Sequence, residues 1–401
     1  MTKAVETREL WKTYGSDIHA VKGANIRIEP GELMVLVGPS GCGKTTTLRM
    51  VAGLERISAG EVRVGDRVVN DVHPARRGVA LVFQNFALYP HKSAFQNMAF
   101  PLESAGVGKD EIRRRVTETA EMLELTAHLD KRPGERSGGQ QQRVSLGRAI
   151  VRNPDVLLLD EPLSNLDARL RVVMRTELKR IQRAVGSTAI YVTHDQVEAM
   201  TMGDRIVVMH AGEVAQIGTP QEVYLTPASL PVARTIGSPA MNLLPGRVQT
   251  GADGMTLSGT GWSVTVTGDA AAHAAQALGG ADIVLGIRPE DLGLGSDAGS
   301  GETAPLLGRG PCLTAEPLGS ETLYNIGLGD APLRLMRRET HVGLPEGANA
   351  PVMLRPGARL HLFDATTGAR RAGLLQNPTP AGTAVWHPYT AATRMDVPVP
   401  P

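Results

Sequence analysis

The chain has 401 residues, 42% of them hydrophobic and 21% charged, and its formal net charge is +1. This length predicts two or three domains, and the balanced charge with only 3% aromatic residues argues against a nucleic-acid partner. No apolar run approaches the ~18 residues of a membrane span, and the polar N-terminus is unlike a signal peptide. The two cysteines are far apart in the sequence and suggest neither a disulfide framework nor a metal cluster, so we expect the protein to reside in a reducing cytoplasm.

The first predicted α/β unit carries a phosphate-binding loop. The apolar run 33–37 is typical of a strand buried on both faces of a parallel sheet. The next residues fit the pattern G-x-x-x-x-G-K-[ST], in which glycines let backbone N–H groups converge on phosphate at a helix N-terminus. Within this loop, the Lys44 ammonium suits the β/γ-phosphates and the Thr45 hydroxyl suits Mg²⁺. The loop consists of Gly38, Pro39, Ser40, Gly41, Cys42, Gly43, Lys44, Thr45 and Thr46.

After the loop the pattern changes from strands to helices. Gly65-Asp66 separates two short β-type runs, as in a hairpin, and residues 78–83 form an apolar strand that ends at Gln84. Residues 109–125 carry apolar side chains on one helical face. We therefore expect a helical subdomain at about residues 89–152, inserted into an α/β domain.

Polar side chains follow three predicted strands. Asp160 and Glu161 stand at the end of an apolar run, His194 directly follows the predicted strand 188–193, and Gln84 follows the strand 78–83. Because ligands of open α/β sheets bind at the carboxyl ends of strands, these side chains are expected beside the phosphates. There Asp160 can support Mg²⁺, Glu161 is the candidate general base for an attacking water, and His194 can reach the γ-phosphate. The amide oxygen of Gln84 can also bind Mg²⁺. Taken alone, His194 and Gln84 are ordinary strand-end residues. Their order along the chain, together with the P-loop and Asp160-Glu161, nevertheless favours a role at the phosphates.

The stretch Ser137-Gly138-Gly139-Gln140 opens the last helix of the predicted subdomain. A Ser-x-x-Gln capping box accounts for its first and last residues, but not for two consecutive glycines, which cost backbone entropy. Glycines there leave N–H groups open to close approach by a phosphate. Further along, residues 164–167 also fit a capping box, and the amphipathic helix after it is expected to end at Gly186.

The composition divides the chain into three parts. Strands alternate with helices to about residue 235, which predicts an α/β domain of residues 1–235. Residues 236–371 are rich in Gly, Ala and Thr, with short strand-like runs and no long helix, which indicates a small all-β module. Residues 372–401 are rich in Pro, and we expect a disordered tail.

The order of these motifs resembles that of the ATP-binding subunits of ABC transporters. Similarity to the importer ATPases for maltose and sn-glycerol-3-phosphate is carried by residues 82–91, 160–168, 191–200, 237–242 and 285–291. The resemblance covers about residues 5–371. It implies an α/β fold of the P-loop NTPase type, with the helical subdomain of an ABC nucleotide-binding domain, followed by an OB-like domain for regulation and dimerisation.

The resemblance also implies roles for single residues. Catalysis would fall to Glu161, His194 and Gln84, and Mg²⁺ binding to Thr45, Gln84 and Asp160. ATP binding would involve Tyr14 on the adenine, the P-loop on the phosphates, and, from a second copy of the chain, Ser137, Gly138, Gly139 and Gln140, with Asp167 at the dimer interface.

The implied partners are a second copy, two integral-membrane permease subunits and, indirectly, a solute-binding protein. Two ATP molecules would be enclosed by the homodimer, which closes on ATP and opens after hydrolysis. The helical block at residues 86–105 would grip the permeases. The chain would thus be a peripheral protein on the cytoplasmic face of the inner cell membrane, touching the membrane only through its permeases.

One position departs from the family, and the cargo stays open. Arg136 stands where a Leu usually precedes Ser-Gly-Gly-Gln, which would place a cation near the partner's nucleotide and alter docking or rate. A carbohydrate or sn-glycerol-3-phosphate is the favoured cargo, with sulfate, polyamine or ferric iron as the alternative. A non-transport ABC ATPase is disfavoured because long coiled-coil insertions and a second cassette are missing, and a P-loop kinase is disfavoured by the Ser-Gly-Gly-Gln stretch.

Overall fold

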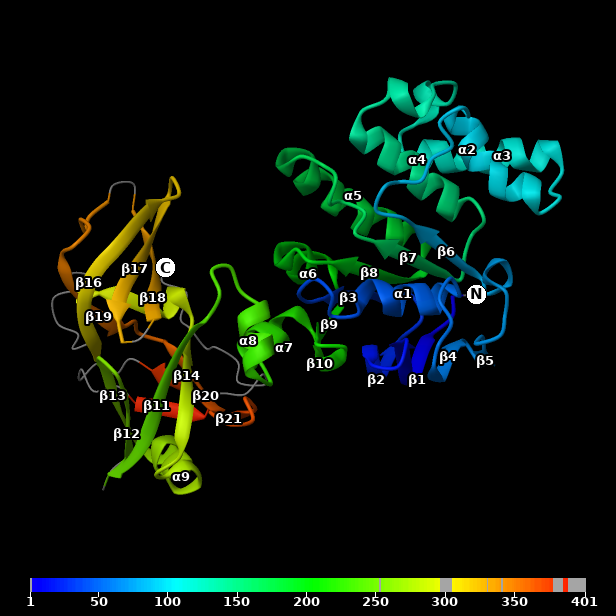
Figure 1. The fold of residues 1–401 in the computed structure, drawn as a ribbon. Helices are drawn as coiled ribbons and strands as arrows, with labels where there is room; N and C mark the ends of the chain where they lie inside the picture. The colour runs from blue at the N-terminus through cyan, green and yellow to red at the C-terminus, as the bar shows by residue number, and fades with distance from the viewer. Residues whose placement is uncertain are drawn as a thin grey trace. The chain divides into compact units, whose positions relative to one another are not determined.

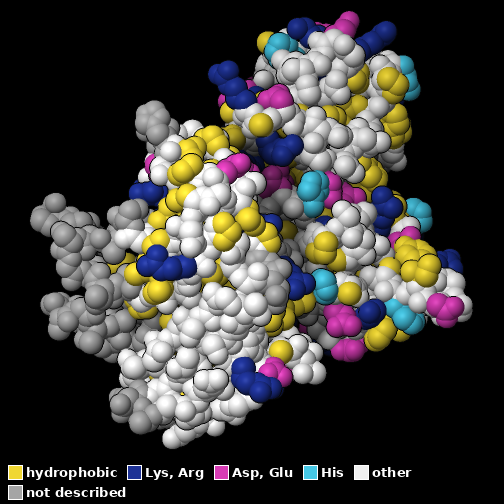
Figure 2. Space-filling view, turned by 60° about the vertical axis from the view of Figure 1, so that its left-hand side comes forward, with side chains coloured by type: hydrophobic (Ala, Val, Ile, Leu, Met, Phe, Trp, Pro, Cys, Tyr) yellow, Lys and Arg dark blue, Asp and Glu magenta, His cyan; other side chains and the backbone are white. Residues whose placement is uncertain are grey.

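The computed structural model describes residues 2–251, 254–295, 305–329, 331–339, 342–377 and 385–388. The chain forms two compact units, Met1–Pro220 and Gln221–Pro401, each with its own hydrophobic core (Figure 1). Within the described ranges, no helix is long and apolar enough to cross a membrane. On the face drawn in Figure 2, Lys and Arg side chains are interspersed with Asp and Glu, as expected from the net charge near zero.

A six-stranded sheet forms the centre of the first unit. Its order is β10-β9-β3-β8-β7-β6, in which β10 alone runs antiparallel to its neighbour. Every residue of β3, β7 and β8 is buried, because a parallel sheet is covered on both faces. The strands are β3 (Leu33–Val37), β6 (Val79–Val82), β7 (Val156–Asp160), β8 (Thr188–Thr193), β9 (Arg205–His210) and β10 (Glu213–Gly218).

A second, antiparallel sheet shares the core of this unit. Helix α1 (Lys44–Ala52) contributes Leu48 to an apolar cluster that also contains Leu36 from the first sheet and Ile26 from the second. The hairpin predicted at Gly65-Asp66 is confirmed, since β4 pairs with β5 there. In order, the strands of this sheet are β2 (Ile18–Ile28), β1 (Val5–Tyr14), β4 (Ala59–Val64) and β5 (Arg67–Val68).

Helices α2 (Ala94–Ser104), α3 (Lys109–Met122) and α4 (Gly138–Ile150) lie between β6 and β7 in the chain and pack on one another. The amphipathic pattern of residues 109–125 thus forms α3, with Ile112 and Val116 buried. Two further helices connect the last parallel strands: α5 (Ala168–Val185) joins β7 to β8, and α6 (Gln196–Met202) joins β8 to β9. As predicted, α5 ends at Gly186, which has a left-handed backbone.

Antiparallel strands dominate the second unit, in agreement with the predicted β module. Their side chains alternate between core and surface, as in β13, where every second residue is buried. The Ala-rich stretch Asp269–Leu278 is an exception: it forms helix α9, because Ala has the highest helix propensity. The strands are β11 (Asn242–Gly251), β12 (Gly254–Gly259), β13 (Trp262–Thr267), β14 (Asp282–Ile287), β15 (Leu292–Leu294), β16 (Leu306–Pro317), β17 (Glu321–Leu328), β18 (Ala331–Arg338), β19 (Asn349–Leu354), β20 (Arg359–Asp364), β21 (Arg370–Asn377) and β22 (Val385–Pro388).

The structure divides the chain at Pro220, earlier than the predicted boundary at residue 235. A buried arginine explains the difference. Arg288 donates to the carbonyl oxygen of Ile236 and, at 2.7 Å, to that of Tyr224, and its guanidinium lies 3.9 Å from the centre of the Tyr224 ring. Helices α7 (Pro220–Leu225) and α8 (Leu230–Thr235) are thereby fastened to the C-terminal unit.

Two strands lie in the stretch predicted as a disordered tail, and for them the prediction is wrong. β21 pairs with β20, and β22 pairs with β21. The edge of β20 would otherwise present unpaired N–H and C=O groups. β21 pairs with them, and β22 then pairs with the next edge, that of β21, in spite of the nearby prolines. Residues 378–384 and 389–401 of the predicted tail lie outside the described residues.

Candidate active site

The parallel sheet brings the ends of four strands to one edge. β3 lies beside β8, β8 beside β7, and β7 beside β6, all in parallel. The P-loop follows β3, Asp160 ends β7, His194 follows β8, and Gln84 comes shortly after β6. Motifs that are far apart in the sequence are therefore collected at the carboxyl edge of the sheet, where ligands of such folds bind.

The Lys44 side chain lies inside the P-loop, and Thr45 links the loop to β7. The Lys44 ammonium donates to the carbonyl oxygens of Gly38 at 2.8 Å and Pro39 at 2.9 Å. The Thr45 hydroxyl donates to Asp160 Oδ1 at 2.9 Å. Asp160 is itself buried, and burial raises the pKa of its carboxyl group. A buried carboxylate of this kind gains stability from a nearby cation.

Glycines shape the concave side of the P-loop. A Cβ atom on Gly38 would lie 2.2 Å from the carbonyl oxygen of Met209, and one on Gly43 would lie 2.5 Å from that of Ala20. Gly43 also has a φ of 103°, so both positions require glycine. At Gly41, in contrast, a Cβ atom would meet only open space. The loop is thus packed closely against its own domain on one side and is open on the other.

Glu161 is contacted by both other predicted catalytic side chains. His194 Nδ1 lies 3.2 Å from Glu161 Oε2, and Gln84 Nε2 donates to the same oxygen at 3.4 Å. The backbone of Glu161 has a φ of 45°, and its N–H donates to the carbonyl oxygen of Val192 at 3.0 Å. A non-glycine residue held in the left-handed region often marks a functional site. Tertiary structure therefore unites Glu161, His194 and Gln84 around one carboxylate.

A buried carboxylate behind His194 was missed by the sequence analysis. Glu198 is 3% exposed and accepts hydrogen bonds from the hydroxyl groups of Tyr191 at 2.8 Å and Thr193 at 2.7 Å. The Thr193 oxygen in turn accepts from the N–H of Asp195 at 2.9 Å, which fixes the turn that carries His194. An acid in the first turn of a helix is usually an exposed partner of the helix dipole, so no local pattern around Glu198 indicates its burial.

The stretch Ser137–Gln140 begins α4 as predicted. Ser137 Oγ accepts from the Gln140 N–H at 3.4 Å, and Gln140 Oε1 accepts from the Ser137 N–H at 3.3 Å, which forms a capping box. Gly138 and Gly139 occupy the first turn. A Cβ atom on Gly139 would lie 3.2 Å from the Leu170 side chain. Close packing against α5 is thus a second reason for glycine that the sequence did not reveal.

The N-terminus of α5 differs from the prediction. Asp167 is the N-cap residue, and its Oδ1 accepts from the Leu170 N–H at 2.9 Å. Ser164 Oγ instead donates to the carbonyl oxygen of Glu161 at 2.9 Å. The capping box predicted for residues 164–167 is therefore wrong, because Ser164 stabilises the turn after β7 rather than the helix.

Tyr14 lies at the end of β1 with 40% of its surface exposed. The Lys12 ammonium lies 4.6 Å from the centre of its ring. This contact holds one side of the ring, and stacking of Tyr14 on adenine stays a prediction.

Arg136, predicted to place a cation near the partner's nucleotide, has its side chain directed into its own subdomain. It is buried, and its guanidinium donates to the carbonyl oxygens of His128 and, at 2.9 Å, Lys131. Burial lowers its pKa, and its Nε and Nη1 atoms have no hydrogen-bond partner. The cation is therefore turned into the helical subdomain, where it ties the residue before Ser137 to the preceding turn.

The ligand set at the sheet edge fits a magnesium–nucleotide complex. The Thr45 hydroxyl, the Asp160 carboxylate and the Gln84 amide are hard oxygen ligands of the kind that Mg²⁺ prefers. Over the described ranges, no group of three or more His, Cys, Asp or Glu side chains could hold a metal ion by itself. Phosphate oxygens and water would have to complete the shell, as is usual for Mg²⁺ at phosphate sites.

Comparison with known proteins identifies the family. Residues 21–164 match the family described as ABC transporter, and residues 237–292 match the MalK OB fold domain. The sulfoquinovosyl glycerol transport ATP-binding protein SmoE of Agrobacterium fabrum is 47% identical over 377 residues, which cover 91% of this chain and 98% of that protein. The chain belongs to the ABC transporter ATP-binding proteins.

Other relatives of this ABC protein serve different solutes. The sn-glycerol-3-phosphate import ATP-binding protein UgpC of Ruegeria pomeroyi is 48% identical over 370 residues, covering 90% of this chain and 97% of the relative. The xylose/arabinose import ATP-binding protein XacK of Haloferax volcanii is 48% identical over 357 residues, covering 88% and 90%. Among solved structures, cbiO1 from Clostridium perfringens, part of the ABC transporter complex cbiONQ, is 28% identical with a TM-score of 0.52, covering 56% of this chain and 92% of that one. The predicted family and fold class are confirmed.

Proposed function

We propose that this ABC protein is the ATP-hydrolysing subunit of a binding-protein-dependent importer. The observation that carries the proposal is the Glu161 carboxylate, which is bound to His194 and Gln84 at the same sheet edge as the P-loop. A carboxylate held in this way suits the deprotonation of a water molecule, and the neighbouring loop suits the phosphates that the water attacks. The full-length similarity to import ATP-binding proteins supports the same conclusion.

Each side chain has a distinct part in the proposed reaction. Lys44 and the P-loop N–H groups hold the phosphates, and Glu161 Oε2 accepts the proton of the attacking water. His194, bound to Glu161 through Nδ1, offers its other ring nitrogen to the γ-phosphate. When bound by Thr45, Gln84 and Asp160, Mg²⁺ supplies positive charge that neutralises the phosphate oxygens. The protein's contribution is mainly positioning and electrostatic stabilisation.

We further propose that a second copy completes each site. Ser137, Gly138, Gly139 and Gln140 form the N-terminus of α4, and N–H groups at a helix N-terminus favour phosphate. These residues contact the ATP held by the partner's P-loop, Asp167 lies at the interface beside them, and Tyr14 stacks on the adenine. Packing of Gly139 on Leu170, in the first turn of α5, supports a common movement of the two helix starts.

A groove on the first unit is the proposed docking site for a cytoplasmic loop of a permease subunit. Its walls include Leu54, Tyr89, Phe100, Pro101, Arg148 and Arg152. Arg148 on α4 donates to the carbonyl oxygens of Phe86 at 3.0 Å and Ala87 at 2.6 Å. Both residues have left-handed backbones, with φ of 60° and 46°. Phe86 stands two residues after Gln84, and α4 begins at Ser137–Gln140. A permease loop in this groove is therefore coupled to Gln84 through Phe86 and to the partner's nucleotide through α4.

The proposed cargo is a carbohydrate or sn-glycerol-3-phosphate, in line with the solutes named for the relatives. Sulfate, polyamine or ferric iron is the alternative. The chain is then bound to the cytoplasmic face of the inner membrane through two permease subunits, which take the solute from a binding protein. Purification with these subunits and identification of the solute decides between the cargo classes: permeases without a sugar-type binding-protein partner would remove the carbohydrate assignment.

The substitution Glu161→Gln tests the proposed reaction. It keeps the size of the side chain and its ability to accept a hydrogen bond but removes the base. We expect ATP binding and ATP-dependent dimerisation to persist, while hydrolysis falls at least about 100-fold, the usual contribution of a general base. Measurements are nucleotide binding, dimer formation by light scattering, and phosphate release.

A matched control is Glu118→Gln, which neutralises an exposed carboxylate on α3. It should leave all three measurements unchanged. If the Glu161→Gln variant still hydrolyses ATP at the normal rate, Glu161 is not the base. If it binds ATP without dimerising, the shared-site arrangement is wrong.

A further inference from the structure

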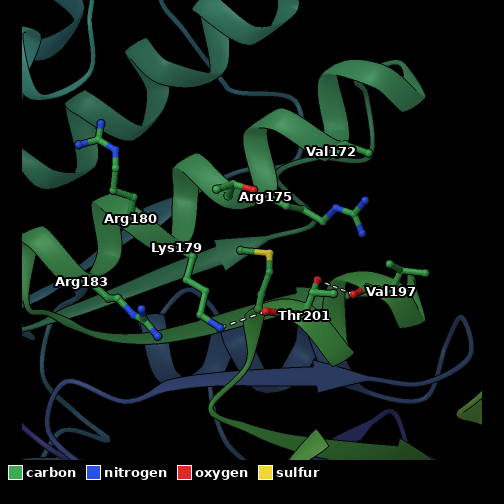
Figure 3. Close-up of a pocket in the computed structure, with 9 residues that line it drawn as sticks. Val172, Arg175, Lys179, Arg180, Arg183, Val197 and Thr201 are labelled. Atoms are coloured by element: carbon green, nitrogen blue, oxygen red, sulfur yellow. Dashed lines mark hydrogen bonds between the residues drawn. The ribbon is translucent and has the colours of Figure 1, made fainter. Parts of the chain in front are cut away.

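A second groove lies between α5 and α6, apart from the P-loop and from the proposed permease site. It encloses about 630 Å³. Its α5 wall is a single helical stripe that includes Val172, Arg175, Lys179 and Arg183, and its α6 wall includes Val197 and Thr201 (Figure 3). None of the proposed steps of ATP hydrolysis uses these side chains.

Positive charge dominates the groove. Arg175 and Arg183 have no ion pair or hydrogen bond within the part of the chain that the structure describes, and no Asp or Glu is among the lining residues. Arg180 borders the same groove, but its guanidinium points to the other side of α5 (Figure 3) and is bound to Glu177 at 2.7 Å. Two unneutralised guanidinium groups therefore face a space that contains no acid.

The two walls are held together at both ends. Toward the start of α5, Arg171 Nη1 lies 3.6 Å from Asp195 Oδ2, and Asp195 is the N-cap of α6. Toward the other end, the Lys179 ammonium donates to the carbonyl oxygen of Thr201 at 3.0 Å. A groove with fixed walls needs little ordering when it binds a ligand, which favours affinity.

Apolar side chains accompany the charges. Val172 is 55% exposed and Val197 is 48% exposed, while Met202 is buried beneath them. Exposed β-branched side chains beside unpaired arginines indicate an occupant that carries both carboxylates and apolar groups. The stripe from Val172 to Arg183 is long enough for about three turns of a facing helix, or ~16 Å at 1.5 Å per residue.

We propose that this groove docks an acidic, amphipathic segment of a partner protein. Charge complementarity with Arg175 and Arg183 selects the carboxylates, and contact with Val172 and Val197 selects the apolar residues between them. A nucleic acid fits less well because the net charge of the chain is only +1 and the exposed Val172 and Val197 side chains would lie against phosphate. The proposal does not rest on ATP hydrolysis, because the groove contains none of the residues assigned to it.

A labelled acidic peptide tests the proposal directly. The probe is a fluorescent 12-residue helix-forming peptide with Glu and Leu on one face, titrated against the full chain by anisotropy. We expect binding that weakens with salt and is reduced about 10-fold in the double variant Arg175→Ala/Arg183→Ala. The matched control is Lys109→Ala/Arg113→Ala, which removes the same charge from α3 and should bind as the unchanged chain does.

The position of the peptide is checked with a photo-crosslinker in place of Thr176, inside the groove. Cross-linking of the peptide at this position supports the proposal. Equal binding by both double variants, or no binding by the unchanged chain, overturns it. Stronger binding of phosphatidylserine vesicles or double-stranded DNA, lost in the Arg175→Ala/Arg183→Ala variant, overturns it in favour of another class of ligand. Circular dichroism and ATP binding establish that each variant is folded.

Discussion

In the first unit the buried charged residues Lys44 and Asp160 lie at the carboxyl edge of a parallel sheet, beside an open loop. In the C-terminal unit Arg288 and Asp291 are buried to a similar degree, but they bind backbone groups of the unit itself: Arg288 donates to the carbonyl oxygen of Tyr224, and Asp291 accepts from the Arg359 N–H. The first set is arranged so that a ligand can complete its interactions, whereas the second is largely satisfied by backbone groups. Burial of charge by itself therefore does not distinguish an active site from a structural anchor, and the position of the charge relative to the sheet edge does.

Among the variants that test this difference between the two units, Arg288→Met should have the largest effect, a loss of stability in the C-terminal unit. It leaves the carbonyl oxygens of Ile236 and Tyr224 without a buried donor, which costs roughly 2–5 kcal/mol of unfolding free energy in the C-terminal unit. Nucleotide binding by the first unit should be unchanged. Calorimetry and hydrogen exchange of β14 measure the effect. The control is Arg338→Met, where the side chain is 92% exposed and no change is expected. Equal stability of the two variants would remove Arg288 as an anchor.

The Asp291 carboxyl should make the stability of the C-terminal unit fall as pH rises. Burial raises its pKa to about 6, above the ordinary value of 3.8, so the native state binds a proton more tightly than the unfolded chain. The resulting stability, of order 2–3 kcal/mol, is fully present below about pH 4 and is lost as pH rises through about 6.

Asp291→Asn mimics the neutral carboxyl and should flatten this part of the pH dependence, measured by urea unfolding between pH 4 and 8. Asp282→Asn, on an exposed side chain of β14, serves as the control and should retain the dependence. An unchanged profile in Asp291→Asn would show that another group titrates.

The substitution Glu198→Gln tests whether the buried carboxylate positions His194. Both hydroxyl groups donate to the same oxygen, Glu198 Oε2. An amide oxygen in its place can accept both hydrogen bonds but carries no negative charge, so both bonds weaken and the turn is held less firmly. We expect kcat to fall about 10-fold with little change in KM for ATP, because the P-loop is untouched. The pH profile of kcat should also move, which a purely structural defect would not produce. Glu213→Gln, on an exposed carboxylate of β10, is the control; a change in KM alone would contradict a positioning role.

The substitution Arg136→Leu should have the smallest effect. It removes hydrogen bonds to His128 and Lys131 but also removes the two unpartnered nitrogen atoms, and these terms nearly cancel. We expect the ATPase rate to change by less than about 5-fold, measured by steady-state phosphate release. If the unchanged chain proved inactive and the leucine restored activity, the arginine would instead be a disabling substitution.

Local sequence was sufficient for the elements whose chemistry is contiguous in the chain. The P-loop, the apolar strands β3, β7 and β8, and the capping box at Ser137 depend on residues within a few positions of one another. Their backbone conformation and hydrogen bonds are therefore encoded locally. The family resemblance added roles to these same positions, and those roles stay predictions.

Only the tertiary structure decided features that depend on contacts across long stretches of chain. Burial of Glu198 follows from its place under β8, the inward direction of Arg136 follows from the turn at His128, and the fastening of α7 and α8 follows from Arg288. The β21 strand forms because β20 offers it an open edge. In each case the residue type allowed several environments, and packing of distant elements selected one of them, whereas the P-loop sequence allowed only one.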